Sequence, residues 1–231
     1  MRQPALIVAI DGPAGVGKST VARLLAKSLG VPVLDTGAMY RTVALEVLER
    51  GIDPDDGAAV EEVCAGIDLE MQLTDAGEIE VLLAGVPVGR RIRTPEVSEA
   101  ASRVSIHPGV RSRMVELQRR TAERTGAVLE GRDIGTVVFP HTPYKFFLTA
   151  RQEVRAERRH RELLAAGKSV DFAEVLADLE ERDDRDESRS HSPLRQDDTY
   201  AVVDSSDIGP PEIVERMVDL IRRRQAELAD G

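Results

Sequence analysis

Cysteine and long apolar segments are scarce in this chain of 231 residues. Its only cysteine, Cys64, excludes an intramolecular disulfide and a metal site built from several cysteines. We expect Cys64 to be a small core side chain, because it lies in a mainly apolar segment. Near the N-terminus the longest apolar run, residues 5–10, is too short for a signal peptide or a membrane span. These absences predict a cytoplasmic protein without a membrane partner.

An excess of acidic residues narrows the possible partners further. The chain has 41 Asp and Glu residues against 31 Lys and Arg residues, which gives a formal net charge of -10. Such a surface repels nucleic acids and anionic membranes, so we expect neither as a partner. With 42% hydrophobic residues, the chain is long enough for one large domain or one domain with an insertion.

Apolar runs alternate with helical patterns along most of the chain. The run at residues 5–10 is continuous, which is typical of a strand buried on both faces in a parallel sheet. Further strands are predicted at residues 31–34, 127–129, 144–148 and 201–203. Helices are predicted at residues 20–29, 38–48, 110–124, 151–166, 172–182 and 211–228. This alternation indicates a doubly wound α/β fold with a central parallel sheet.

The segment at residues 68–93 departs from this rhythm. Apolar residues alternate with polar ones at 69–73 and at 79–83, on either side of a turn at 74–77 that includes Ala76 and Gly77. This pattern predicts a hairpin, with a third extended piece at residues 86–88. We therefore expect a small antiparallel insertion in the α/β domain.

A glycine-rich motif lies between the first predicted strand and the first predicted helix. Residues 12–19 read GPAGVGKS and match the phosphate-loop pattern G-x-x-x-x-G-K-[ST] completely. The glycines allow backbone N–H groups to surround a polyphosphate, and the helix N-terminus adds partial positive charge. Lys18 can reach the β- and γ-phosphates, and the Ser19 hydroxyl can ligate Mg²⁺. A glycine-rich turn without a ligand is the alternative. The predicted ATP-binding residues are Gly12, Pro13, Ala14, Gly15, Val16, Gly17, Lys18, Ser19 and Thr20.

The phosphate loop alone does not separate kinases from GTPases or motors. The sequence contains no Asn-Lys-x-Asp segment for reading guanine, and no clear Asp-x-x-Gly switch follows an apolar strand. Small-molecule kinases are therefore the leading class, with UMP, AMP or shikimate as possible acceptors. A regulatory module that binds ATP without turnover is a second alternative.

Two further motifs follow predicted strands directly. Residues 34–41 read LDTGAMYR, and residues 130–136 read EGRDIGT. Doubly wound sheets bind ligands at the carboxyl ends of their strands, so both motifs are candidates for an acceptor site. Helix capping is the alternative role for Asp35, and a surface ion pair is the alternative for Arg132.

These motifs together resemble those of bacterial cytidylate kinases. The resemblance rests on residues 11–20 (DGPAGVGKST), 34–41 and 131–140 (GRDIGTVVFP), with shorter matches at 92–94, 182–186 and 192–194. It implies a three-layer P-loop kinase fold with a small antiparallel insertion on the CMP side, a helical lid and a monomeric state. The implied reaction uses ATP with Mg²⁺ and phosphorylates CMP or dCMP. Thr36 stands where many relatives have serine, and Glu130 where many have aspartate.

The resemblance also implies roles for individual residues. Arg41 and Arg132 would hold the CMP phosphate, while Arg182 and Asp186 would face the sugar. The cytosine would be surrounded by Ser102, Arg111, Asp133 and Arg189, and Thr36 completes the CMP-binding set. A carboxylate and a guanidinium complement the N4 donor and N3 acceptor of cytosine, whereas uracil reverses both. Without the resemblance, the sequence of residues 180–189 would predict only a solvated helix end.

A basic cluster follows the strand predicted at residues 144–148. As a helix, residues 151–161 place Arg151, Arg155, Arg158 and Arg159 near one face. A solvated face paired through Glu153 and Glu157 is one interpretation, but the resemblance favours a lid whose arginines close over the phosphates.

We expect a direct in-line transfer, with Lys18, Arg132 and Arg158 as catalytic residues. The expected single domain, residues 1–231, divides into a core (about 1–60, 108–150 and 190–231), a CMP-side insertion (about 61–107) and a lid (about 151–189).

Overall fold

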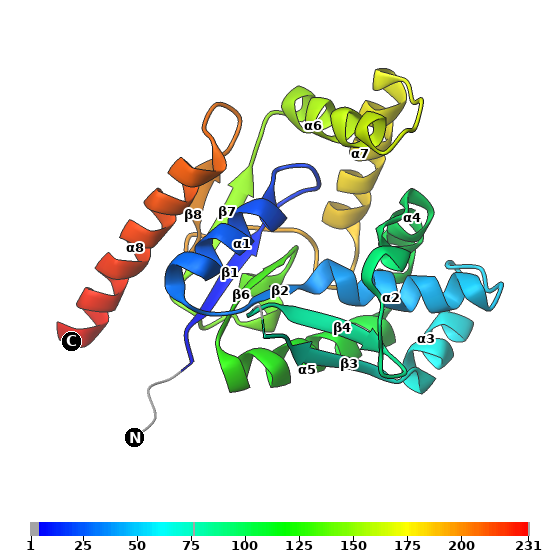
Figure 1. Cartoon of the computed structure of the whole chain (residues 1–231), viewed down its shortest axis with the longest axis horizontal. Helices are drawn as coiled ribbons and strands as arrows, with labels where there is room; N and C mark the ends of the chain where they lie inside the picture. The colour runs from blue at the N-terminus through cyan, green and yellow to red at the C-terminus, as the bar shows by residue number, and fades with distance from the viewer. Residues whose placement is uncertain (1–4, 76, 231) are drawn as a thin grey trace. The chain divides into compact units, whose positions relative to one another are not determined.

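Two β-sheets organise the residues that this computed structural model describes, 5–75 and 77–230. The larger sheet has five strands in the order β2-β6-β1-β7-β8, and the smaller has three in the order β3-β4-β5 (Figure 1). The strands are β1 (Ile7–Asp11), β2 (Val33–Asp35), β3 (Leu69–Leu73), β4 (Ile79–Leu83), β5 (Val86–Pro87), β6 (Ala127–Gly131), β7 (Lys145–Thr149) and β8 (Ala201–Asp204). The larger sheet is parallel and flanked by helices, and the strands of the small antiparallel sheet come between β2 and β6 along the chain. This arrangement confirms the predicted fold class.

The helices account for most of the remaining chain. They are α1 (Lys18–Leu29), α2 (Thr36–Glu49), α3 (Gly57–Gly66), α4 (Pro95–Val104), α5 (Pro108–Thr125), α6 (Gln152–Ala165), α7 (Phe172–Ser188) and α8 (Pro210–Asp230). Two short helical segments, η1 (Gly89–Arg93) and η2 (Ile134–Val138), add to them. Contacts divide the chain into unit 1, Val31–Glu130 with the N-terminal residues up to Ile7, and unit 2, Val8–Gly30 with the residues from Gly131 onward.

In unit 1, β2 and β6 pair in parallel. Leu34 lies opposite Leu129, and Asp35 lies opposite Glu130. The short β2 leads directly into α2, because the Asp35 carboxylate accepts a hydrogen bond from the N–H of Ala38 at 3.0 Å and caps that helix. The motif after the second predicted strand therefore begins a helix at the carboxyl end of that strand.

The small sheet of unit 1 is antiparallel. β3 pairs with β4, with Leu69 opposite Leu83, and β5 pairs with the other edge of β4. In the turn, the N–H of Thr74 donates to the carbonyl of Glu78 at 2.8 Å. Ala76, part of the predicted turn, lies outside the described residues. The predicted hairpin and its third strand are confirmed.

The sequence patterns did not predict two helices of unit 1, α3 and α4. Each begins at a capping side chain: Asp56 accepts from the N–H of Ala59 at 3.2 Å, and Thr94 accepts from the N–H of Val97 at 3.2 Å. Pro95 occupies the first turn of α4, where its fixed φ suits a helix. Both helices have ten residues, so their periodicity is short and easily hidden beside a strand-rich segment.

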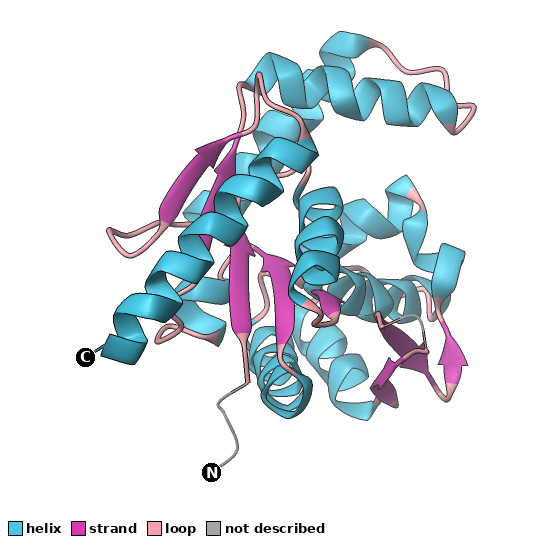
Figure 2. Ribbon diagram, turned by 60° about the vertical axis from the view of Figure 1, so that its left-hand side comes forward, coloured by secondary structure: helices cyan, strands magenta, loops and turns pink. Residues whose placement is uncertain are grey.

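In unit 2, β7 pairs in parallel with both β1 and β8. Ile10 lies opposite Phe146, which in turn lies opposite Ala201. α1 follows β1 after the glycine-rich loop, and α8 packs against α1 (Figure 2). α7 continues to Ser188, beyond its predicted end at residue 182, because the buried Asp186 has ion-pair partners in the folded chain.

Apolar side chains fill the interior of each unit. In unit 1, Leu34 and Leu129 are fully buried, and Cys64 is 1% exposed, which confirms its predicted place in the core. Burial raises the pKa of the Cys64 thiol. In unit 2, Ile10 and Phe146 form part of the buried set. None of the described helices has the length and apolar character needed to cross a membrane.

Replacing Leu34 by alanine should lower the free energy of unfolding by about 2–5 kcal/mol, because it leaves a cavity beside the central sheet. Leu164 on α6 is 50% exposed and provides a matched control. Leu164→Ala should change the free energy of unfolding by less than about 0.5 kcal/mol. Urea denaturation measures both variants, and equal effects would contradict the core position of Leu34.

Candidate functional site

The glycine-rich loop joins β1 to α1 and is tightly enclosed. Gly12 has φ 150°, and a Cβ at this position would lie 2.0 Å from the carbonyl oxygen of Leu148 on β7. Gly15 has φ 77°, and its Cβ would lie 3.1 Å from the Cβ of Arg155 on α6. Glycine is therefore required at both positions, by backbone conformation and by the close approach of neighbouring elements.

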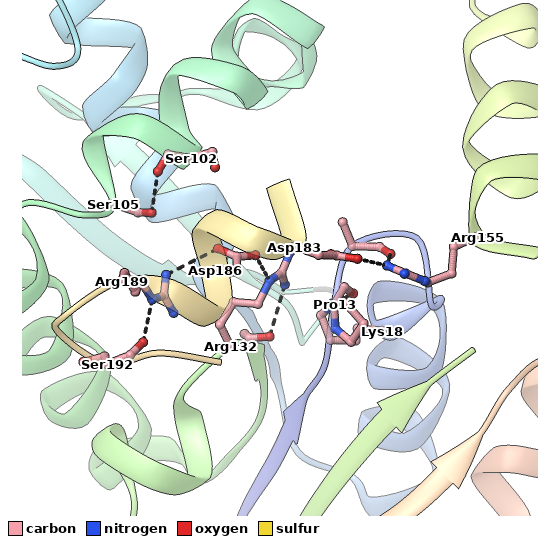
Figure 3. A network of polar contacts seen from close by, with 12 residues as sticks. Pro13, Lys18, Ser102, Ser105, Arg132, Arg155, Asp183, Asp186, Arg189 and Ser192 are labelled. Atoms are coloured by element: carbon pink, nitrogen blue, oxygen red, sulfur yellow. Dashed lines mark hydrogen bonds and ion pairs between the residues drawn. The ribbon is translucent and has the colours of Figure 1, made fainter. Parts of the chain in front are cut away.

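Lys18 begins α1 and folds back over this loop. Its Nζ donates a hydrogen bond to the carbonyl oxygen of Pro13 at 2.6 Å, and the side chain is buried (Figure 3). Ser19 and Thr20 lie in the first turn of α1, where Ser19 is half-buried and Thr20 is exposed. The loop thus holds an ammonium group and a hydroxyl group next to a helix N-terminus, which favours anions.

Helices α6 and α7 pack directly on the loop. Ala14 forms a buried apolar cluster with Ala156, Val175 and Leu179, which come from these two helices. Dispersion and the removal of apolar surface from water stabilise this contact. The tip of the loop is therefore part of the small core of the two-helix segment.

Two arginines of α6 point toward the loop. Arg155 is buried, pairs with Asp183 of α7 at 2.5 Å and donates to the carbonyl of Ala14 at 3.3 Å. Arg158 donates to the Ser205 carbonyl at 2.6 Å and to the Val16 carbonyl at 3.4 Å.

The other two arginines of the predicted face are more exposed. Arg151 forms a bidentate ion pair with Asp207, and Arg159 pairs with Glu162. Among the described residues, the side chains that pair with or accept from the four arginines include Asp183, Ser205, Asp207 and Glu162. The hydrogen bond with Asp207 raises the pKa of Arg151, and the charge of Glu153 raises it further. The interpretation of a face paired through Glu153 and Glu157 therefore stays beside that of a lid.

A second cluster of unit 2 centres on Asp186 of α7, which is 5% exposed. Its carboxylate accepts a hydrogen bond from Nε of Arg132 at 2.7 Å and pairs with Arg189 at 3.5 Å (Figure 3). Burial raises the pKa of Asp186, but the charges of Arg132, Arg189 and Arg182 outweigh it and hold the pKa below its usual value. One carboxylate thus pairs with two guanidinium groups, and the charge of a third acts on it.

Asp35 and Arg41 occupy the carboxyl end of β2 in unit 1. Arg41 pairs with the Asp35 carboxylate at 2.8 Å, and Arg93 pairs with it at 3.1 Å. Burial raises the pKa of Asp35, but these two guanidinium groups lower it by more. The Thr36 hydroxyl donates to the carbonyl of Glu130 at 2.6 Å. Asp35 is thus both the helix cap considered from the sequence and the ion-pair partner of Arg41.

Ser102 and Arg111 lie in a buried polar group of unit 1. Arg111 lies over the ring of Tyr40, with its Cζ 5.6 Å from the ring centroid, and donates to the carbonyl of Ser105 at 3.0 Å. The Ser105 hydroxyl in turn donates to the carbonyl of Ser102 at 2.8 Å. The Oγ of Ser102 is buried and has no hydrogen-bond partner among the described residues, so it is available to a ligand.

The predicted residues fall into two groups, one in each unit. Thr36, Arg41, Ser102 and Arg111 belong to unit 1, whereas the phosphate loop, Arg132, Asp133, Arg158, Arg182, Asp186 and Arg189 belong to unit 2. The sequence analysis missed the supporting residues Tyr40, Asp183 and Ser205. Tyr40 and Asp183 lie inside motifs that had been noticed, but nothing near Ser205 in the sequence indicated its role.

Comparison with known proteins decides the family. A family model described as cytidylate kinase matches residues 8–223. The chain belongs to the cytidylate kinase family. It is 49% identical to the cytidylate kinase of Corynebacterium glutamicum, over 94% of each chain. It is 46% identical to that of Syntrophotalea carbinolica, over 95% of this chain and 93% of the relative.

Membership of the cytidylate kinase family makes the chain an ATP-dependent phosphotransferase and confirms the resemblance noted from the motifs. An uncharacterized protein from Eubacterium ventriosum has a similar fold, with a TM-score of 0.54 and 16% identity. That alignment covers 95% of this chain and 99% of the other.

The pH dependence of stability should report on the Asp186 cluster of this cytidylate kinase. Because the folded-state pKa of Asp186 is lowered, its ion pairs stabilise the fold above the unfolded pKa of about 3.9, and this stability is lost as the pH falls further. At pH 7, Asp186→Asn should cost about 1–3 kcal/mol, because it removes the carboxylate charge that pairs with Arg132 and Arg189. The difference from the unmodified protein should shrink below about pH 4.

Asp184→Asn provides the matched control, because Asp184 lies on the same helix and is exposed. It should change the free energy of unfolding by less than about 0.5 kcal/mol at every pH. Urea denaturation between pH 3 and 8 measures both variants. A pH-independent difference for Asp186→Asn would contradict an ionised Asp186.

Proposed function

We propose that this cytidylate kinase transfers the γ-phosphoryl group of ATP directly to the phosphate of CMP or dCMP, giving ADP with CDP or dCDP. One observation carries the proposal. A complete phosphate loop, enclosed by β7 and α6, leads into α1 in a chain that the cytidylate kinase model matches over residues 8–223. The relatives named above match nearly the whole chain, and both are called cytidylate kinase.

The donor site is assigned to residues 12–20. The backbone N–H groups of the loop and the N-terminus of α1 favour the β- and γ-phosphates. Lys18 would exchange the carbonyl of Pro13 for phosphate oxygens, which accept a stronger, charge-assisted hydrogen bond. No covalent contribution from the protein is required at this step.

Mg²⁺ is the proposed metal, and Ser19 its protein ligand. Among the described residues, no group of three His, Cys, Asp or Glu side chains could hold a metal ion. A single hydroxyl fits, because Mg²⁺ prefers oxygen ligands and at phosphate sites is bound by few protein groups together with the phosphates. Bound there, the metal would neutralise charge on the phosphate oxygens.

The roles of the individual acceptor residues form a further part of the proposal. Arg41 and Arg132 are assigned to the CMP phosphate, and Arg182 and Asp186 to the sugar. Ser102, Arg111, Asp133 and Arg189 are assigned to the cytosine, with Thr36 completing the set. The available Oγ of Ser102 and the buried guanidinium of Arg111 support the base assignment. The ion pair with Asp186 also supports a role for this carboxylate in orienting Arg132.

The proposed transfer needs alignment and charge neutralisation rather than a general base. The acceptor phosphate has a second pKa of about 6 and is largely a dianion at neutral pH. Two polyanions must then approach closely, so the cations Lys18, Arg41, Arg132 and Arg158 bind and orient them. Helices α6 and α7 would exclude water when they close, with Arg158 exchanging its carbonyl partners for phosphate oxygens.

The domain plan forms part of this proposal. A CMP-side insertion at about 61–107 would contain the small antiparallel sheet, and a lid at about 151–189 would contain α6 and α7. We further propose a monomer, as the family resemblance implies. We also propose that it acts in the cytoplasm, where a free thiol such as that of Cys64 stays reduced.

The acceptor can be tested by measuring ADP release from ATP and Mg²⁺ with CMP, dCMP, UMP and AMP offered separately. We expect turnover with CMP and dCMP, and a kcat/KM at least about 100-fold lower with UMP, because uracil leaves the buried polar groups of the site unpaired. A flat response to all four would overturn the acceptor assignment. ATP binding without any turnover would favour a nucleotide-binding module instead.

Lys18→Ala should lower kcat by at least about 100-fold, because it removes a positive charge from the phosphates in the transition state. Lys27→Ala is the matched control, since Lys27 lies exposed on the same helix and should leave kcat unchanged. Steady-state kinetics measure both variants, and circular dichroism checks their folding. Near-normal turnover by folded Lys18→Ala would contradict the donor site.

A further inference from the structure

Asp11 is a buried carboxylate that no step of the proposed transfer uses. It is the last residue of β1, directly before Gly12, and is fully buried. One carboxylate oxygen accepts a hydrogen bond from the N–H of Ile134 at 2.9 Å. The other accepts from the N–H of Gly135 at 2.8 Å and from the hydroxyl of Tyr200 at 2.7 Å. Burying a carboxylate is costly, so its presence requires a reason.

The surroundings of Asp11 do not make it a stabilising ion pair. All three donors are uncharged groups. Burial raises the pKa of Asp11 to about 6, although the three hydrogen bonds lower it, and the nearby charge of Asp133 raises it further. The ionised form therefore costs folding free energy at this position compared with the protonated form.

The hydrogen bonds of Asp11 join two segments that are far apart in the sequence. Ile134 and Gly135 directly follow Arg132 and Asp133, the acceptor residues proposed above. Asp11 itself directly precedes the phosphate loop. A single side chain thus connects the backbone after the acceptor pair to the start of the donor loop, and all of these residues belong to unit 2.

Close packing leaves this connection little room to shift. A Cβ on Gly135 would lie 2.5 Å from the hydroxyl oxygen of Tyr200 and 3.0 Å from Cδ of Lys145. Lys145 in turn lies over the Tyr200 ring, with its Nζ 5.8 Å from the centroid, and donates to the hydroxyl of Thr199 at 3.0 Å. Tyr200, the third donor to Asp11, is therefore itself held in place.

We propose that Asp11 is a positioning residue, which holds Arg132 and Asp133 at a fixed place relative to the phosphate loop. This inference rests on the proposed function. In-line transfer requires the two phosphates to be aligned, and a displacement of about 1 Å can cost about 100-fold in rate. Asparagine cannot replace the carboxylate here, because its amide group has one acceptor oxygen and would direct its own N–H₂ donor toward another donor.

The test compares Asp11→Asn with the unmodified enzyme. The variant should lower kcat/KM for CMP roughly 10- to 100-fold, while KM for ATP changes less than about 3-fold. Its unfolding midpoint should fall, because the amide leaves at least one of the three buried donors without its acceptor, so the kinetics are measured well below that midpoint. Asp219→Asn, at an exposed position on α8, is the matched control and should leave all of these quantities unchanged.

A double-mutant cycle separates positioning from a general loss of structure. In an Arg132→Ala background, Asp11→Asn should lower kcat/KM for CMP by a smaller factor than in the unmodified enzyme, because one of the two side chains that it positions is absent. Fully additive effects would overturn the proposal. So would an unchanged kcat/KM for CMP, or a loss of ATP affinity equal to the loss for CMP.

If Asp11→Asn does not fold, Tyr200→Phe decides the question. This variant removes one donor from the carboxylate and leaves both backbone hydrogen bonds in place. A loss of about 2- to 5-fold in kcat/KM, confined to CMP, supports the proposal, and no loss or a loss confined to ATP overturns it. Activity of the unmodified enzyme toward CMP is the reference throughout. If the unmodified enzyme has no activity toward CMP, the proposed function itself fails. If it is active but Asp11→Asn has none of the expected effects, only the role of Asp11 fails.

Discussion

Cationic charge has to be gathered at the sites of this acidic chain before a nucleotide binds, although like-charged guanidinium groups repel one another. The folded chain places a carboxylate beside several of the arginines proposed for these sites. Asp186 holds Arg132 and Arg189, and Asp183 holds Arg155. These pairs reduce the repulsion and restrict the side-chain rotamers. An incoming phosphate therefore meets arginines that are already ordered, which lowers the entropy lost on binding.

Packing joins the phosphate loop to the helices that carry several of these arginines. The methyl group of Ala14 lies in the apolar cluster of α6 and α7, and Gly15 lies against Arg155. A change in the position of the two helices must therefore alter the packing around Ala14 and Gly15 at the loop tip. A movement of α6 and α7 and a change at the phosphate loop are thus linked through direct contacts.

Local patterns in the sequence were sufficient for the main architecture. The continuous apolar run before Gly12, the phosphate-loop pattern and the alternating residues of the small sheet each act within a few neighbouring positions. Helices α3 and α4 were not predicted from these patterns, because both are short and lie near strands in the sequence. The end of α7 was placed too early, because residues 183–188 contain no apolar residue that continues the helical pattern.

The sequence by itself determined the fold class, the donor loop and, through ordered motifs, the family. Only the tertiary structure decided which carboxylate holds which arginine and where Asp11 forms its hydrogen bonds. The physical reason is sequence separation. Arg132 and Asp186 are 54 positions apart, and Asp11 and Ile134 are 123 positions apart. Periodicity and capping describe neighbouring residues, whereas contacts over such distances form only when the whole sheet and its helices assemble.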